Sequence, residues 1–259
     1  MKRLVIPLPN IHFDPSEVAI PWKICKNNNI EIIFSTPTGL IPTCDPIMLT
    51  GTGLGLLSSI LACTSDVVEK YNEMILSIEF QNPISWLELK YDEYDGILLP
   101  GGHDKGVKEY LESKILQQLI IQFYNHKKII AAICHGVVLV GRCIQNNGKS
   151  ILYGMKTTSL LKQQELTAYR ITCLWMGEYY LTYPELTVED EIKTYLKNDI
   201  DFISGLNPGI TRDTINNYNS NQINNHIVHD IDHNYLSARW PGDCYLFSHT
   251  LVDMLQNSK

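Results

Sequence analysis

The sequence predicts an α/β fold built on a mostly parallel sheet, and three observations lead to this conclusion. The chain opens with an apolar strand, a helix and a second strand over residues 4–35, a β-α-β unit that joins parallel strands by a right-handed crossover. Two later segments, Gly96–Leu99 and Ile129–Ile133, are short apolar runs typical of buried parallel strands. A helical pattern lies between them, so the alternation of strand and helix continues.

The composition is that of a globular protein and excludes several functions. The chain has 259 residues, of which 44% are hydrophobic and 19% charged, enough for one large core or two small ones. Its net charge of −7, with no offsetting cluster of Lys and Arg, argues against nucleic-acid binding. Seven cysteines without a C-x-x-C pair indicate free thiols, which are typical of a reducing compartment. The first apolar run is broken by Pro7 and Pro9 and is too short for a signal peptide or a membrane span. We therefore expect a cytoplasmic protein without membrane contact.

The first crossover contains a helix start with an acidic residue in its first turn. Leu4–Leu8 is predicted as the first strand and Glu31–Ser35 as the second. Between them Asp14 can cap a helix, Pro15 suits its first position, and Glu17 occupies the third. The third position is also where the glutamate of a capping box lies, so Glu17 has a structural interpretation beside any functional one.

Residues 43–92 form a long insertion after the second strand. Two helical patterns are predicted in it, over Leu56–Cys63 and Ser65–Glu79. We expect the insertion to form a lid or a partner surface, because so long a connection is unusual in a compact domain. The glycine-rich run Gly51–Leu56 follows no strand and lacks G-x-G-x-x-G spacing, so it does not predict a phosphate site.

A glycine-rich turn, Pro100–His103, follows the strand Gly96–Leu99 directly. Glycines at such a turn let backbone N–H groups face an open space, as an oxyanion hole requires, although a plain tight turn is the structural alternative. The helical pattern of Lys105–Asn125 then leads into the strand Ile129–Ile133. Two consecutive strands thus deliver their loops to the same edge of the sheet, where open α/β sheets place their sites.

The second of these loops contains the strongest candidate for a catalytic group. Cys134, His135 and Gly136 separate the strand Ile129–Ile133 from a helical apolar run, Val137–Val140. A sharp strand-to-helix turn presents its side chain at the sheet edge, as in G-x-S-x-G hydrolases. The helix N-terminus favours the thiolate, so we predict that Cys134 is a nucleophile rather than a small buried hydrophobe. His135 can contribute through its ring or through its backbone N–H.

The last third of the chain contains fewer sequence motifs. Glu165 comes after a possible strand and reads as a surface carboxylate. His226 and His229 would point to opposite faces of a strand, so no metal site is predicted there. The predicted elements are a strand Met155–Ser159, a short helix in Gln163–Ala168, a capped helix Thr187–Leu196, an asparagine-rich loop Asn216–Asn225, a hairpin of Ile227–Asp230 and Tyr235–Ala238, and a helix Cys244–Gln256.

Several of these motifs together resemble the ThiJ/PfpI superfamily, which has the class I glutamine-amidotransferase-like fold. They are AAICHG at residues 131–136, LPGGHD at 99–104 and the acidic residue after the first strand. DPSEVAIPWK near the start and SARWPGD near the end extend the likeness over most of the chain. The large insertion and the histidine directly after the cysteine resemble the longer branch, which includes HchA-type chaperones and glutathione-independent glyoxalases.

The resemblance implies a fold and a set of site residues. The fold would be one domain, residues 1–259, a flavodoxin-like three-layer sandwich with a lid-like insertion at about 43–92 and an elaboration at about 170–235. It would usually pair as a homodimer. No metal ligands carry over, so no metal or cofactor is expected. The implied site comprises Cys134 as nucleophile, His135 as its partner, Glu17 as the carboxyl group facing the sulfur, Glu165 orienting the histidine, and Gly101, Gly102 and the His135 N–H as the oxyanion site.

The resemblance also implies an activity. A cofactor-free glyoxalase would convert methylglyoxal or glyoxal to a 2-hydroxy acid through a hemithioacetal on Cys134. One alternative is a stress protein, either a chaperone that masks unfolded chains or a redox sensor that is oxidised at Cys134. Another is a cysteine-dependent amidase, peptidase or deglycase. The expected partners are a small aldehyde and a second copy of the chain, with neither nucleic acid nor membrane.

Overall fold

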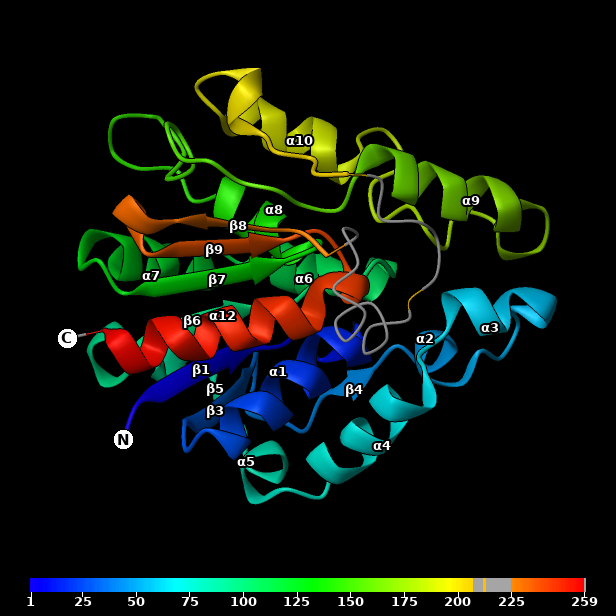
Figure 1. Cartoon of the computed structure of the whole chain (residues 1–259), viewed down its shortest axis with the longest axis horizontal. Helices are drawn as coiled ribbons and strands as arrows, with labels where there is room; N and C mark the ends of the chain where they lie inside the picture. Colours follow the sequence, from blue (N-terminus) through cyan, green and yellow to red (C-terminus); the bar gives the residue numbers. More distant parts are fainter. Residues whose placement is uncertain (207–211, 213–224, 259) are drawn as a thin grey trace.

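The strands of the computed structural model form one seven-stranded sheet of order β5-β3-β1-β6-β7-β9-β8 (Figure 1). The structure describes residues 1–206, 212 and 225–258. Every neighbouring pair in this sheet is parallel except β8 and β9, which form the predicted C-terminal hairpin. The strands are β1 Arg3–Pro7, β3 Glu31–Thr36, β5 Ile84–Ser85, β6 Gly96–Leu99, β7 Ile129–Ile133, β8 Ile227–Asp230 and β9 Tyr235–Ala238. The predicted α/β class and mostly parallel sheet are confirmed.

Helices cover both faces of the sheet and complete a flavodoxin-like sandwich of three layers. Helices α1 (Pro15–Asn27) and α12 (Cys244–Asn257) lie on one face, with α4 (Ser65–Met74) packed outside α1 (Figure 1). Helices α7 (Lys114–Asn125) and α8 (Gly136–Gly141) lie on the other. Strand β7 supplies both cores, because successive side chains of a strand point to opposite faces. Ile129, Ala131 and Ile133 pack in the first core, Ile130 and Ala132 in the second.

The insertion between β3 and β6 is more broken than its pattern predicted. A small second sheet pairs β2 (Ile11–Phe13) with β4 (Thr43–Cys44). The first predicted helix is only a 3-10 turn and the single-turn α3 (Ser58–Leu61), and the second ends at Met74. The turn after Met74 leads into a separate helix, α5 (Ile78–Gln81), which Ser77 caps. Helix α2 (Pro46–Thr50) precedes them.

The region after α8 differs from its prediction in two places. Met155–Ser159 is not a strand, and only Thr157 makes an isolated bridge, to Phe202. This segment instead crosses β9 through side-chain hydrogen bonds, such as Thr157 Oγ1 to the Tyr235 hydroxyl at 2.9 Å. Helix α9 (Lys162–Met176) is much longer than the short helix predicted there.

The predicted helical stretch Lys105–Asn125 is divided into a 3-10 turn, the short helix α6 (Lys108–Leu111) and the helix α7, which Ser113 caps. The capped helix, the hairpin and the last helix agree with prediction. Helix α10 (Val188–Tyr195) begins after Thr187, whose hydroxyl accepts the Asp190 N–H at 3.3 Å. The predicted loop Asn216–Asn225 lies outside the described residues except for Asn225. The shorter helical segments are α6 Lys108–Leu111 and the 3-10 turns Gly55–Leu57, Trp86–Glu88, Tyr91–Glu93, Lys105–Val107, Asp199–Asp201, Ile231–His233 and Pro241–Asp243.

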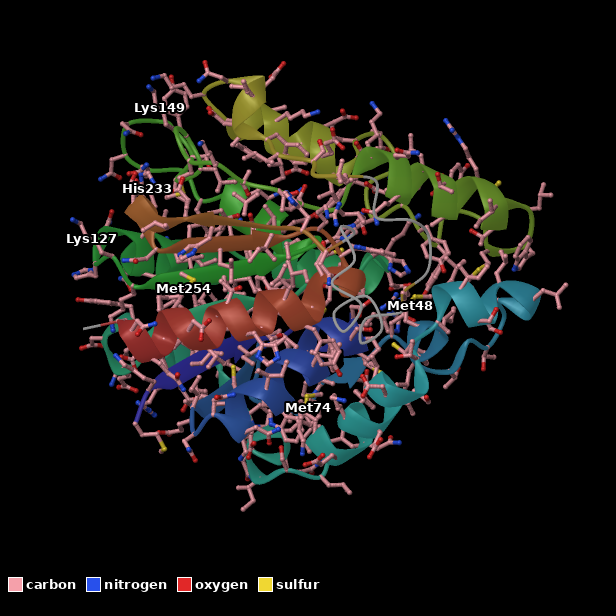
Figure 2. All side chains as sticks on the ribbon, in the orientation of Figure 1. Met48, Met74, Lys127, Lys149, His233 and Met254 are labelled. Atoms are coloured by element: carbon pink, nitrogen blue, oxygen red, sulfur yellow. The ribbon has the colours of Figure 1, made fainter. Side chains whose placement is uncertain are left out.

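Labelled side chains mark the two ends of the sheet. Figure 2 shows Lys127 and His233 at one end and Met48 at the other, beside the loops that follow the parallel strands. Of the helices described, none combines the length and the apolar character needed to cross a bilayer.

Candidate active site

Cys134 occupies a strained turn between β7 and α8. Its backbone is left-handed, with φ at 58°, a conformation that costs free energy for any residue other than glycine. Two glycines make room for the turn. A Cβ added to Gly136 would lie 2.0 Å from the Leu99 carbonyl oxygen, and one added to Gly101 would lie 2.7 Å from the His135 nitrogen. The predicted sharp turn therefore depends on close contact between the loops after β6 and β7.

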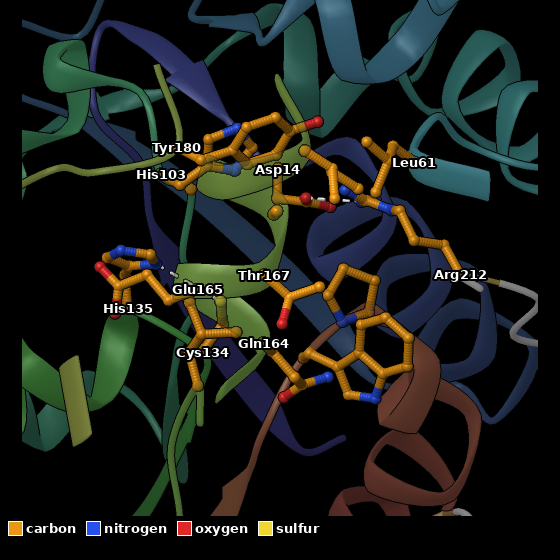
Figure 3. A pocket seen from close by; sticks show the side chains of 16 residues that line it. Asp14, Leu61, His103, Cys134, His135, Gln164, Glu165, Thr167, Tyr180 and Arg212 are labelled. Carbon is orange, nitrogen blue, oxygen red and sulfur yellow. Dashed lines mark hydrogen bonds and ion pairs between the residues drawn. The ribbon is translucent and has the colours of Figure 1, made fainter. Parts of the chain in front are cut away.

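A cavity of about 90 Å³ opens over the sulfur (Figure 3). Cys134, His135 and Gly102 lie at one end of it, and the side chain of Cys134 itself is only 6% exposed. At ~10–15 Å³ for each water, the space holds several waters or one small molecule. Most of its walls are apolar and come from Leu61, Leu160, Ala168, Ile171, Trp240 and Pro241.

The carboxyl group of Glu17 points at the loop after β6 and at the sulfur. Its Oε2 atom accepts the Gly101 N–H at 2.7 Å, and its side chain lies close enough to Cys134 for each group to influence the pKa of the other. A capping box is absent, because the Asp14 N–H donates to the Gly101 carbonyl oxygen at 3.0 Å instead. Asp14 alone caps α1, through the N–H groups of Ser16 and Glu17. The structural interpretation of Glu17 therefore does not hold.

Burial sets the protonation of this pair. It raises the pKa of Glu17 well above 4.5, and the charge of Asp14 raises it further, so the protonated form of the carboxyl group is favoured. Because Oε2 accepts the Gly101 N–H, the proton belongs on Oε1, which has no hydrogen-bond partner within the described chain. Burial likewise raises the pKa of Cys134, with the Glu17 charge as the next cause. Burial therefore opposes the thiolate that the helix N-terminus was predicted to favour. A six-residue helix does not offset complete desolvation.

The ring of His135 does reach the sulfur. Its Nδ1 atom lies 3.4 Å from Cys134 Sγ, and its Nε2 atom lies 3.0 Å from Thr182 Oγ1. The Thr182 hydroxyl donates its proton to the His103 carbonyl oxygen at 2.6 Å, so Nε2 must be the donor to Thr182. Nδ1 therefore presents a lone pair to the thiol. Burial, with smaller effects of His103 and Arg142, lowers the pKa of His135 to about 3, and the ring is neutral.

Glu165 does not orient His135. It lines the cavity and is only 3% exposed, so it is not a surface carboxylate either. Its Oε2 atom accepts the Val188 N–H at 2.9 Å, in the first turn of α10. Burial raises its pKa to about 7, although the Val188 hydrogen bond acts in the opposite direction. Thr182 holds the histidine instead, and no motif in the sequence marks Thr182.

One of the three N–H groups implied for an oxyanion site already has an acceptor in the structure. The Gly101 N–H is already used by Glu17 and cannot bind an oxyanion. Gly102 lines the cavity, and its N–H donates to no acceptor among residues 1–206, 212 and 225–258. The His135 N–H faces the Cys134 sulfur. Gly102 and His135 are therefore the available donors.

The far end of the cavity contains an ion pair that the sequence did not reveal. Arg212 Nη2 lies 2.6 Å from Asp14 Oδ2, and both side chains are buried (Figure 3). Beside them His103 stacks on Tyr180 with ring centroids 4.6 Å apart. Within the part of the chain that the structure describes, no three His, Cys, Asp or Glu side chains gather as a metal site would require.

The sheet is flavodoxin-like, and the turn after its central strand carries a cysteine followed by a histidine. This combination is that of the class I glutamine-amidotransferase-like fold. The chain belongs to the ThiJ/PfpI family, because the family model described as ThiJ/PfpI family-like matches residues 8–195.

Individual relatives agree with this assignment. The uncharacterized protein C14C4.04 of Schizosaccharomyces pombe is 24% identical over 189 residues, which are 68% of this chain and 69% of the relative. The glutathione-independent glyoxalase hsp3101 of the same yeast is 25% identical over 159 residues, which are 60% of this chain and 61% of the length of hsp3101. Among solved structures, glyoxalase III of Candida albicans matches with a TM-score of 0.66 and 15% identity, over 98% of this chain and 97% of that one.

Proposed function

We propose that the protein is a glutathione-independent glyoxalase that converts a small 2-oxoaldehyde, such as methylglyoxal, to a 2-hydroxy acid. One observation supports this most directly. The sulfur of Cys134 lies between the imidazole of His135, which can accept its proton, and the carboxyl group of Glu17, whose raised pKa favours the protonated form that can donate one. The similarity to hsp3101 and to the glyoxalase III fold supports the same reaction.

The first step joins substrate and enzyme. His135 Nδ1 takes the thiol proton, and the sulfur of Cys134 attacks the aldehyde carbon. The N–H groups of Gly102 and His135 are the donors available to the developing oxyanion. The oxyanion then takes the proton from Glu17 Oε1, which gives the hemithioacetal and a Glu17 carboxylate.

The second step moves hydrogen between the two carbons. The Glu17 carboxylate removes the proton from the former aldehyde carbon and returns it to the neighbouring carbon through an enediol. The His135 imidazolium protonates the oxygen on the neighbouring carbon. The imidazole that results then accepts the hydroxyl proton from the oxygen on the former aldehyde carbon. The product of this rearrangement is the thioester of a 2-hydroxy acid on Cys134.

Hydrolysis of the thioester restores the resting site. Water adds its hydroxyl to the acyl carbon, and its remaining proton goes to the Glu17 carboxylate. The imidazolium of His135 returns its proton to the departing sulfur of Cys134. Every group then has its starting protonation, so the cycle needs neither glutathione nor another cofactor.

A single assay tests this function. Purified protein is incubated with methylglyoxal in the absence of glutathione, and lactate formation is followed for wild type and Cys134→Ala. We expect lactate from wild type only. Cys173→Ala is the matched control, because Cys173 is a partly exposed thiol on α9 that does not line the cavity. Lactate from Cys134→Ala at the wild-type rate, or none from wild type, would contradict the proposal.

A holdase is a second candidate because of apolar side chains exposed near the cavity. Leu56 in the insertion is 98% exposed and Leu174 on α9 is 94% exposed, and Trp175 is exposed beside Leu174. The Trp175 indole N–H donates to the Gly53 carbonyl oxygen at 3.0 Å and so joins the two segments. If this surface binds unfolded chains, Leu56→Ser with Leu174→Ser will reduce suppression of aggregation, and Cys134→Ala will not.

The oligomeric state and the location in the cell are also proposals. We propose a cytoplasmic homodimer, and light scattering on the purified protein tests the dimer.

A peptidase is disfavoured because the sulfur lies in a small, largely apolar cavity with little exposure.

A further inference from the structure

Arg212 carries a buried charge at the edge of the cavity. Its Nη2 atom lies 2.6 Å from Asp14 Oδ2 and 3.0 Å from Ser16 Oγ, and its Nη1 atom lies 3.0 Å from Met48 Sδ. The side chains of Arg212 and Asp14 are 8% and 4% exposed. Figure 3 shows this pair across the cavity from Cys134. A buried charge of this kind is stable only with its partner in place.

Asp14 connects this pair to the reacting groups through three hydrogen bonds. Its Oδ1 atom accepts the Glu17 N–H at 3.3 Å, and its own N–H donates to the Gly101 carbonyl oxygen at 3.0 Å. The Gly101 N–H in turn donates to Glu17 Oε2. Asp14 therefore links the guanidinium of Arg212 to Glu17, the acidic residue beside the Cys134 sulfur.

Other charges around the cavity have partners of their own. Asp45 accepts the Tyr179 hydroxyl at 2.5 Å, and Asp243 pairs with Arg239 at 3.0 Å. Within the described residues, Arg212 is the cationic side chain at ion-pair distance from Asp14. The ionisable groups on the neighbouring elements are His103 and Asp104 after β6, Cys63 after α3, Tyr180 after α9, and Cys244 at the start of α12. His135 and Glu165 line the cavity as well.

We propose that Arg212 is a positioning residue: by pairing with Asp14 it balances the charge beside Glu17 and Cys134, so that the sulfur loses its proton and reacts at lower pH than it would beside an unpaired Asp14. The inference rests on the proposed role of Cys134 as the nucleophile. The directions of the electrostatic effects support it. The Asp14 charge raises the pKa of both Glu17 and Cys134, whereas the Arg212 charge lowers the pKa of Glu17. Loss of Arg212 leaves the Asp14 charge uncompensated.

The test measures the sulfur itself rather than turnover. Full-length wild type and variants react with iodoacetamide from pH 6 to 10, and the labelled Cys134 peptide is quantified by mass spectrometry. For Arg212→Met we expect the profile to move by about one pH unit to higher pH, which is about a tenfold loss of rate at pH 7. Arg212→Lys, which retains the charge, should stay closer to wild type. Arg3→Met is the control, because Arg3 lies at the opposite end of β1 in a half-exposed pair with Glu31.

A double variant separates electrostatics from structure. Asp14→Asn keeps a good helix cap and removes the carboxylate charge, so it should restore the wild-type profile when combined with Arg212→Met. An unchanged profile for Arg212→Met, or no restoration by Asp14→Asn, would overturn the proposal. If Arg212→Met does not fold, Arg212→Gln, which also removes the charge, supplies the same comparison alone and with Asp14→Asn. A shifted profile in a protein that makes no lactate would support the role of Arg212 while contradicting the glyoxalase function.

Discussion

The backbone N–H of Gly101 donates to Glu17 Oε2 at 2.7 Å, and this hydrogen bond holds the carboxyl group of the first helix against the turn that carries Cys134. It leaves Oε1 free to carry a proton toward the sulfur of Cys134. The same bond removes the Gly101 N–H from the oxyanion site. The hydrogen bond between Gly101 and Glu17 thus leaves Glu17 Oε1 as the atom that can carry a proton and leaves Gly102 and His135 as the candidate oxyanion donors.

Glu17→Gln should abolish turnover while leaving the thiol reactive. The amide can still accept the Gly101 N–H through its carbonyl oxygen, but it cannot shuttle a proton between the two carbons. Loss of a general acid–base group costs about 10²–10⁴-fold in rate. The measurement is lactate formation together with labelling of Cys134 by iodoacetamide.

The control for this change is Glu31→Gln, on β3 outside the cavity, which should retain full activity. Normal turnover by Glu17→Gln would eliminate Glu17 as the proton shuttle, whatever the behaviour of Cys134.

Thr182→Val should reduce kcat because the hydroxyl that accepts from His135 Nε2 is lost. The imidazole could then carry its proton on Nδ1, where it cannot accept the proton of the thiol. A buried donor left unsatisfied costs about 1–3 kcal/mol, which corresponds to about a 5- to 150-fold lower rate. Thr182→Ser retains the hydroxyl and should stay near wild type. Equal kcat values for the Val and Ser variants would show that the hydroxyl does not set the tautomer.

The sheet and the nucleophile turn were predictable because their determinants are local. Short apolar runs predicted β6 and β7, and the Cys-His-Gly turn between Ile133 and Val137 predicted the position of Cys134. The orientation of Glu17 could not be derived in this way. A third-position glutamate suits a capping box and a catalytic acid equally, and only the loop after β6 decides between them.

The protonation states and the partner of His135 were not predictable from local pattern. Thr182 lies 47 residues beyond His135 in the chain, and a threonine in no motif gives no signal of the contact. The predicted thiolate of Cys134 depended on a helix N-terminus, a local feature. The pKa of that thiol is instead raised first by burial, and then by the charges of Glu17 and Asp14, which lie more than a hundred residues earlier in the chain.

Glu165→Gln should alter the pH dependence of stability far more than it alters turnover. In the folded protein burial raises the pKa of Glu165 from 4.5 to about 7, so folding favours its protonated form. This stabilisation is present below pH 4.5 and is lost as pH rises to 7, a change of about 3 kcal/mol. Thermal unfolding from pH 5 to 8 should therefore show wild type losing stability relative to Glu165→Gln.

Glu178→Gln is the control for this comparison, since Glu178 is exposed and pairs with Lys105. A large fall in kcat for Glu165→Gln, with no change in the pH dependence of stability, would instead favour the implied role of Glu165 in orienting His135.

Ala168→Phe should block the cavity and lower kcat/KM for methylglyoxal by at least about tenfold. Ala168 lies on α9 among the apolar walls, and a benzyl group is comparable in size to the space of about 90 Å³ above the sulfur. The same variant should slow the labelling of Cys134, because iodoacetamide must enter by the same route. Ala168→Ser, which adds one atom, is the matched control and should leave both rates near wild type. Unchanged turnover and labelling in Ala168→Phe would mean that the substrate reaches Cys134 by another route.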